Sequence, residues 1–246
     1  MILFLTSSPY VYQHSPATLT EANGFLLRLR SKLPPHPKTL FVASSPAEHD
    51  RTDFYCGDMA GAFARAGISM PGWQILDDLT ADRARELVAW SDFIILMGGH
   101  VPTQNEFFHR IGLKRLLQGY PGVVMGISAG TMNSADLVYA QPELEGEAAD
   151  SGYVRFLKGL GLTQANILPH YQMVKDSWLD GMRLYEDITF GDSYGQEFLV
   201  LPDGSYLMAY DGEELLFGEA WLIRNGRIEK ISEEGQSMPY LRSENG

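Results

Sequence analysis

The sequence predicts an α/β fold in which helices cover both faces of a mainly parallel sheet, followed by a C-terminal antiparallel β extension at about residues 196–232. Two observations carry this prediction. Short, continuously apolar runs alternate with helix-length segments through the first half, as buried parallel strands do. Asp-Gly and Asn-Gly pairs then separate short strand-like runs, which is typical of hairpins. No Pro/Gly/Ser-rich linker divides the two patterns, so we expect one domain over residues 1–246.

The individual elements follow from local signals. The first helix should stop before the "PPHP" stretch, Gly67 should end the second, Thr80 is a plausible N-cap for the third, and Gly112 should break the fourth. Apolar β-type runs predict strands at 2–6, 39–43, 73–76, 92–97, 123–127 and 165–168, and the segments between them predict helices at 19–33, 50–66, 80–90 and 103–117.

Composition excludes several classes of function. The 19 Lys and Arg residues against 31 Asp and Glu give a net charge of −12, which disfavours binding to nucleic acid or to an anionic membrane. The short apolar N-terminus lacks the features of a signal peptide, and no segment is long enough for a membrane helix. The single cysteine, Cys56, cannot form an intramolecular disulfide. These features together favour a soluble cytoplasmic protein. We expect no metal and no cofactor, because metal-ligand spacing and phosphate-loop or dinucleotide motifs are missing.

The segment "GISAG" fits the G-x-S-x-G pattern of a nucleophile elbow, with Ser128 at its centre. An apolar strand precedes it and small residues that can start a helix follow, which is the context that the elbow requires. In that setting the backbone N–H of Ala129 can point at a developing oxyanion. The alternative is that Ser128 caps a helix and the glycines serve packing alone.

A serine nucleophile needs a base, and His170 in "NILPHYQ" is the only histidine after Ser128. It stands at the end of a predicted strand, where α/β enzymes collect functional groups. Asp203 in "LPDGS" is a candidate for the acid that orients the histidine, although "PDG" is also an ordinary turn. The Ser–acid–His order of α/β-hydrolases would instead need an acid among Asp136, Glu143, Glu145, Glu147 and Asp150.

The glycine pair in "LMGGHV" follows a predicted strand and offers a second oxyanion donor at Gly99. The order Ser128, His170, Asp203 suits the sequence better than the α/β-hydrolase order. It takes its acid from the β-rich C-terminal part of the chain, which the other order would leave without a site residue.

"GISAG" after a strand, "GG" after the preceding strand, "PH" some forty residues on and "LPDG" further on resemble the dipeptidase E (aspartyl dipeptidase) and cyanophycinase-like family of serine peptidases. The resemblance covers roughly residues 1–225. It implies a flavodoxin-like sheet related to class I glutamine amidotransferases. It also implies Ser128 as nucleophile, His170 as base, Asp203 where dipeptidase E has Glu, and Gly99 and Ala129 as oxyanion donors.

The expected function is a serine-type dipeptidase that hydrolyses small peptides through an acyl-enzyme on Ser128. The segment after His170 departs from the arginine-containing pattern of dipeptidase E, which leaves Arg183 as a candidate for a substrate carboxylate. Glu143, or its neighbour Glu145, is a candidate for the substrate ammonium. An esterase-like hydrolase and a non-catalytic metabolite-binding homologue remain alternatives, and dimerisation through sheet edges stays open.

Overall fold

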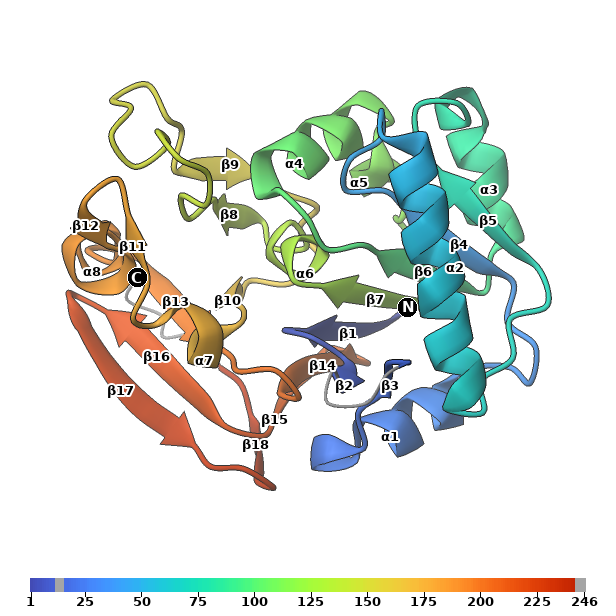
Figure 1. The fold of residues 1–246 in the computed structure, drawn as a ribbon. Helices are drawn as coiled ribbons and strands as arrows, with labels where there is room; N and C mark the ends of the chain where they lie inside the picture. Colours follow the sequence, from blue (N-terminus) through green and yellow to red (C-terminus); the bar gives the residue numbers. More distant parts are fainter. Residues whose placement is uncertain (12–15, 242–246) are drawn as a thin grey trace.

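The computed structural model describes residues 1–11 and 16–241 of the chain (Figure 1). Its central sheet has eight strands. Five of them run parallel, and the last three along the chain pair antiparallel beside β1. Their order across the sheet is β18 (Ser237–Pro239), β15 (Glu213–Phe217), β14 (Tyr206–Tyr210), β1 (Ile2–Thr6), β7 (Val123–Ile127), β6 (Phe93–Leu96), β4 (Thr39–Val42) and β5 (Trp73–Leu76).

Continuously apolar strands form because both faces of this sheet are covered. In β4, Leu40 and Val42 pack in one cluster with residues of α3 (Ala84–Trp90) and α4 (Val101–Arg110). Phe41 packs in another cluster with residues of α1 (Phe25–Lys32) and α2 (His49–Arg65). Side chains alternate between faces along a strand, so a strand buried on both sides must be apolar at every position. The prediction of a mainly parallel α/β fold is confirmed.

The helices agree with the sequence pattern in place and differ in length. The first predicted helix is shorter than expected, because Asn23 and Gly24 adopt left-handed backbone conformations just before Phe25. The fourth breaks at Gly112, as predicted. None of the helices within the described residues is long and apolar enough to span a membrane. The bounds are α1 (Phe25–Lys32), α2 (His49–Arg65), α3 (Ala84–Trp90), α4 (Val101–Arg110), α5 (Leu113–Leu116), α6 (Ala129–Met132), α7 (Tyr171–Val174) and α8 (Phe190–Asp192), with 3₁₀ turns η1 (Ala22–Gly24) and η2 (Ala81–Arg83) and the π-helical η3 (Leu184–Thr189).

Thr80 does not cap the third helix with its side chain. Its hydroxyl donates to the carbonyl of Ile75 and accepts from the N–H of Asp77, so it closes a turn after β5.

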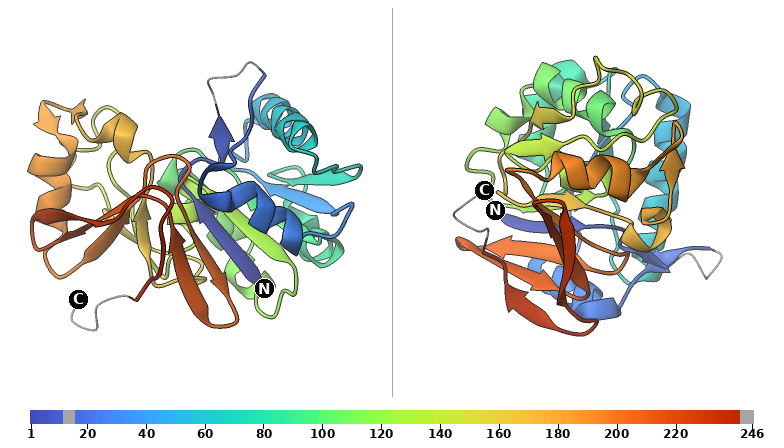
Figure 2. Two further views of the ribbon diagram at one scale, coloured as in Figure 1. Left: turned by 90° about the horizontal axis from the view of Figure 1, so that it is seen from below. Right: turned by 90° about the vertical axis from the view of Figure 1, so that its left-hand side faces the viewer.

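The C-terminal strands are antiparallel, as expected, but they divide between two sheets. β14, β15 and β18 extend the central sheet, while a second sheet forms at the end of the molecule opposite α2 and α3 (Figures 1 and 2). The strand order in this second sheet is β10 (Asn166–Leu168), β13 (Glu197–Val200), β16 (Ala220–Arg224) and β17 (Arg227–Ser232). Three two-stranded antiparallel pairs lie outside the two sheets: β2 (Tyr10–Val11) with β3 (Thr18–Leu19), β8 (Leu137–Tyr139) with β9 (Phe156–Lys158), and β11 (Trp178–Leu179) with β12 (Met182–Arg183).

Candidate active site

Ser128 lies on a sharp turn between β7 and α6. Its backbone has φ 49° and ψ −110°, a sparsely populated conformation for a residue with a side chain. Its N–H lies 3.2 Å from the carbonyl oxygen of Thr6 and 3.1 Å from that of Ser7, which holds the turn against the end of β1. This is the geometry of a nucleophile elbow, in which a strained backbone exposes the hydroxyl at the top of the sheet.

The two glycines of the motif allow α6 to approach the sheet. A Cβ at Gly126 would lie 2.8 Å from the backbone nitrogen of Thr131, and one at Gly130 would lie 2.6 Å from the carbonyl carbon of Leu96. Both neighbours are backbone atoms, which a rotamer change cannot move aside. The spacing G-x-S-x-G is therefore a packing requirement of the elbow.

We expect Gly130→Ala to lower the free energy of unfolding by about 1–3 kcal/mol or more, because α6 must move away from β6 to admit the methyl group. Gly57→Ala in α2 is the matched control, since nothing lies within 4 Å of a Cβ there. In a helix interior that change should stabilise the protein by up to about 1 kcal/mol. Urea unfolding of the two variants tests the difference, and equal stabilities would contradict this account of the motif.

The second sheet brings His170 and Asp203 together. Leu168 at the end of β10 pairs in parallel with Val200 at the end of β13. His170 follows the first strand by two residues and Asp203 follows the second by three, so both side chains emerge at the same edge. His170 adopts a left-handed conformation with φ 60°, which turns the chain into α7.

Three side chains form a continuous hydrogen-bonded chain. Nε2 of His170 lies 2.9 Å from Oγ of Ser128, and Nδ1 of His170 lies 2.7 Å from Oδ1 of Asp203. A carboxylate can only accept, so the proton sits on Nδ1 and the lone pair of Nε2 faces the serine hydroxyl. Burial raises the pKa of Asp203, but hydrogen bonds from His170, Ser7 and Gln172 more than offset it, and the pKa lies below its ordinary value of 3.8. The carboxyl is therefore ionised at neutral pH.

Ser7, which the sequence analysis did not single out, supports this arrangement. Its buried hydroxyl donates to Oδ1 of Asp203 at 2.7 Å and accepts the backbone N–H of His170 at 2.7 Å. Gln172 adds a second support, because its Oε1 accepts the N–H of Asp203. The only sequence signal for Ser7 is its position directly after the first strand, and many serines share that feature.

The two expected oxyanion donors lie on either side of the serine. Ala129 is the first residue of α6, and Gly99 lies in the loop after β6. A Cβ at Gly98 would lie 3.3 Å from Cβ of Ser128, so this loop runs directly beside the serine. Within residues 1–11 and 16–241, neither the N–H of Gly99 nor that of Ala129 donates to another protein group. Gly99 is exposed, whereas Ala129 is fully buried.

A cleft of about 870 Å³ lies between α2, α4 and the loop after β8. Gly99 and Ile127, the residue before Ser128, line it, whereas Ser128, His170 and Asp203 do not. The Glu143 carboxylate lies in this cleft and forms no hydrogen bond or ion pair within the described part of the chain. Protein atoms around it raise its pKa by desolvation, and Glu147 adds to the effect, while His100 and His170 act in the opposite direction. Glu147 itself is engaged: it accepts the N–H groups of Glu143 and Leu144 and pairs with His100.

Arg183 does not line the cleft. It lies in β12, and its guanidinium forms an ion pair with Asp187 at 2.5 Å. Glu143 and Glu145 are both exposed in the loop after β8, but Glu145 does not line the cleft. Cys56 is fully buried, and burial raises the pKa of its thiol to about 12, so it is an inert core residue.

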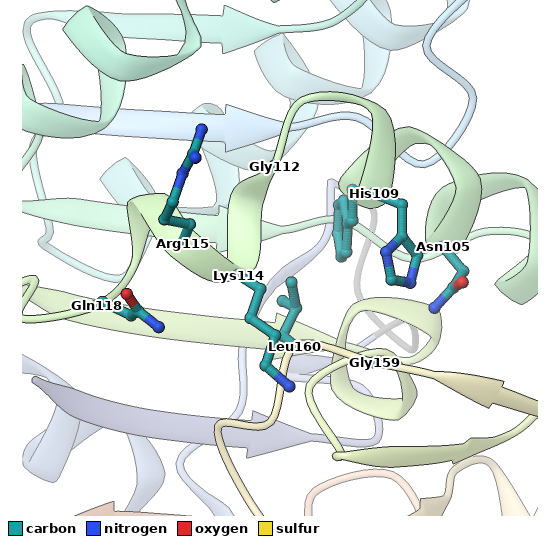
Figure 3. A pocket seen from close by; sticks show the side chains of 9 residues that line it. Asn105, His109, Gly112, Lys114, Arg115, Gln118, Gly159 and Leu160 are labelled. Atoms are coloured by element: carbon teal, nitrogen blue, oxygen red, sulfur yellow. The ribbon is translucent and has the colours of Figure 1, made fainter.

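A second cavity of about 400 Å³ lies where α4 and α5 meet the chain after β9 (Figure 3). Asn105 and His109 of α4 form part of its wall, with Lys114 and Leu160 nearby. None of the three hydrogen-bonded residues Ser128, His170 and Asp203 lines it.

Comparisons with known proteins show the family of the chain. The sequence matches the model of peptidase family S51 over residues 3–215. The structure resembles that of a peptidase from an acI-B1 Actinobacterium, with 17% identity, coverage of 97% of this chain and 96% of the other, and a TM-score of 0.63. It also resembles a protein assigned to peptidase E from Listeria monocytogenes EGD-e, with 16% identity, coverage of 94% and 98%, and a TM-score of 0.57. No curated protein matches the sequence. The family match spans most of the chain, and the chain therefore belongs to peptidase family S51 and is a peptidase.

Proposed function

We propose that the protein is a serine peptidase that hydrolyses small peptides with a free N-terminus, using Ser128 as nucleophile, His170 as general base and Asp203 as the acid that orients the base. The observation that carries this proposal is the hydrogen-bonded chain from Ser128 Oγ through the imidazole to Asp203, with distances of 2.9 and 2.7 Å. A merely structural serine would not need an ionised carboxylate that fixes the tautomer of its histidine partner.

In the proposed reaction, Oγ of Ser128 attacks the scissile carbonyl carbon while Nε2 of His170 takes its proton. The N–H groups of Gly99 and Ala129 bind the resulting oxyanion. The tetrahedral intermediate then collapses, the C–N bond breaks, and His170 gives the proton to the leaving amine. Water then attacks the acyl carbon while His170 takes one of its protons, and His170 returns this proton to Oγ of Ser128 as the acyl–Oγ bond breaks and the second product, a carboxylic acid, leaves.

The charges in the cleft favour a substrate ammonium over a substrate carboxylate. The two arginines that line the cleft are already paired, Arg51 with Glu48 and Arg110 with Asp78. The carboxylate of Glu143, in contrast, has no protein partner among the described residues and lies close enough to His170 to interact electrostatically with it. We therefore propose that Glu143 binds the α-ammonium group and that the enzyme has no strong preference for N-terminal aspartate.

A panel of dipeptides, their N-acetylated forms and the corresponding esters, followed by mass spectrometry, tests the function. We expect cleavage of free dipeptides and weak cleavage of acetylated ones. Turnover of esters without peptides would favour an esterase, and no turnover together with no labelling of Ser128 by a fluorophosphonate would favour a non-catalytic binding protein. A marked preference for Asp-containing dipeptides would contradict the proposed role of the cleft charges.

We expect Glu143→Gln to raise KM for free dipeptides by about 10- to 100-fold, the value of a charge-assisted hydrogen bond, with a smaller effect on kcat. The KM for an N-acetylated peptide or an ester should stay unchanged, since neither carries the ammonium. Glu145→Gln is the matched control, because it removes the same charge from the same loop outside the cleft. Equal KM changes in the two variants would mean that only the general charge of the loop matters.

The same pair of variants predicts a pH dependence. The pKa of Glu143 is raised, so on acidification this carboxylate becomes neutral at a higher pH than an ordinary glutamate with a pKa of 4.5. Wild-type KM for free dipeptides should therefore rise as the pH falls through that raised pKa, and Glu143→Gln should lack this rise. Initial rates measured from pH 4 to 8 with both enzymes, at about equal ionic strength, test the sign.

A further inference from the structure

Three buried amide side chains connect the loop that carries Gly99 with helix α6, which begins at Ala129. Gln104 and Asn133 are fully buried and Asn105 is 6% exposed. Nε2 of Gln104 donates to the carbonyl of Met97 at 2.7 Å, and its Oε1 accepts from Nδ2 of Asn133 at 3.1 Å. Asn133 in turn accepts from Nδ2 of Asn105 at 3.0 Å. Buried amides are costly unless bonded, and these three are bonded to one another.

The orientation of every amide group is fixed by a backbone carbonyl. The carbonyl oxygens of Met97, Val101 and Lys158 can only accept, and each receives one amide N–H, from Gln104, Asn133 and Asn105 respectively. The oxygen of Gln104 therefore faces Asn133, the oxygen of Asn133 faces Asn105, and these amide groups have one arrangement.

Gln104 closes the loop between β6 and α4 from both ends. Its side chain holds the carbonyl of Met97, and its backbone N–H donates to the carbonyl of His100 at 3.1 Å. Between these two anchors lie only Gly98 and Gly99, two residues without side chains to fix their own conformation. Since each peptide unit is planar, holding the Met97 carbonyl also fixes the direction of the Gly98 N–H and the position of the Gly98 Cα. The peptide that carries the Gly99 N–H begins at that atom, so only the Gly98 dihedral angles remain to orient it.

Asn133 connects this loop to the helix that follows Ser128. Its backbone N–H donates to the carbonyl of Ala129 at 2.8 Å, and its side chain donates to Gln104 and to the first residue of α4, Val101. The two expected oxyanion donors thus belong to separate segments, which the Asn133 side chain links through its hydrogen bonds to Gln104 and Val101. An oxyanion site requires both donors at hydrogen-bond distance from the same oxygen, so a small shift between them is costly.

We infer that Gln104 and Asn133 are positioning residues that set the geometry of the oxyanion hole, with Asn105 holding Asn133 from the wall of the smaller cavity (Figure 3). This inference rests on the proposed serine peptidase function. In this inference Gln104 and Asn133 touch neither the substrate nor the reacting atoms. They act on the transition state through the loop after β6.

Gln104→Met is the principal test, because methionine keeps the volume and removes both hydrogen bonds. We expect kcat to fall by about 10- to 100-fold with KM nearly unchanged, since the oxyanion forms only after binding. The inhibition constant of a peptidyl trifluoromethyl ketone, which forms a tetrahedral adduct, should rise by the same factor, while that of a product amino acid should not change. Rates are expressed per active site titrated with a fluorophosphonate, so unfolded protein does not count.

Asn105→Ala is the second variant and keeps the test decisive if Gln104→Met does not fold. His109 also donates to the Lys158 carbonyl, so this loss leaves that group bonded. We expect about a 3- to 10-fold loss of kcat with the same inhibitor signature. Tyr120→Phe, which removes a buried hydrogen bond to the Ser91 carbonyl near the opposite ends of β6 and β7, is the control and should keep wild-type kcat.

The inference would be overturned if the folded variants kept the kcat and the inhibitor affinity of the wild type. It would also be overturned if a variant lost equal affinity for the product and for the trifluoromethyl ketone, because that result would indicate general disorder of the site. A wild-type enzyme that cleaves no peptide or ester and does not react with the fluorophosphonate would instead overturn the proposed function, and this inference with it. Hydrolysis by the wild type is therefore measured first.

Discussion

Ser128→Ala should lower kcat/KM by about 10⁴- to 10⁶-fold, because the variant has no nucleophile and retains only the oxyanion donors and the substrate site. A fluorophosphonate should add a single adduct to the wild-type protein, visible in its intact mass, and no adduct to Ser128→Ala. His170→Ala should also resist labelling, since a serine without its base reacts slowly. Labelling of Ser128→Ala at an unchanged rate would show that another residue is the nucleophile.

Ser128→Gly separates chemistry from folding in this experiment. The serine has φ 49°, a conformation that glycine adopts at little cost, and relief of such strain is worth about 1–3 kcal/mol. We expect the glycine variant to be as inactive as the alanine variant and at least as stable as the wild type in urea. A variant that is both inactive and strongly destabilised would mean that the serine side chain is needed for the fold of the elbow.

Asp203→Asn should have the second largest effect and lower kcat by about 10³- to 10⁴-fold. The asparagine amide can donate to Nδ1 of His170, which would favour the tautomer with its proton on Nε2, facing Ser128. KM should change little, because the Asp203 carboxylate bonds to Nδ1 of His170 and acts through the imidazole. Asp203→Glu should retain more activity than the asparagine variant, since it keeps the charge and the acceptor.

Asp192→Asn is a suitable control for Asp203→Asn. Asp192 is also partly buried and bonded, with the Tyr139 hydroxyl and the Arg155 guanidinium each at 2.7 Å, but it lies away from the three-residue chain. We expect it to lose stability and keep kcat. If Asp203→Asn stayed active while Glu143→Gln lost kcat, the orienting acid would be Glu143 and the proposed assignment would be wrong.

Asp203 should also contribute to stability in a pH-dependent way. Its pKa in the folded protein lies below the ordinary value of 3.8, so folding favours the ionised form. The contribution is complete above the unfolded-state pKa and is lost as the pH falls through the lower folded-state pKa. The difference in unfolding free energy between wild type and Asp203→Asn should therefore be constant between about pH 5 and 8 and shrink below about pH 4.

Local sequence signals were sufficient for the parallel core and for two residues of the site. Apolar runs predicted the inner parallel strands β1, β4, β6 and β7, because a strand buried on both faces has few polar positions. The edge strand β5 was predicted as well, although it carries the exposed Gln74. The elbow was recognisable because the glycines on either side of Ser128 are required by contacts within a few residues of the serine and with the neighbouring strand. His170 stood out because it is the only histidine after Ser128 and follows a short apolar strand.

The other parts of the site depend on contacts between distant segments, which no local pattern encodes. Asp203 meets His170 only because β10 and β13 pair in one register, and Ser7 reaches Asp203 across 196 positions of sequence. The sequence made Arg183 a candidate for binding a substrate carboxylate, but in the structure its guanidinium forms an ion pair with Asp187. The buried amide of Gln104 likewise has no distinguishing sequence signal, because its partners are the Met97 carbonyl and Asn133. The sequence by itself determined where the strands and the elbow form, since those depend on burial and on near neighbours. Only the tertiary structure decided which polar groups face one another, because hydrogen-bond partners are selected by strand register and by the packing of separate segments.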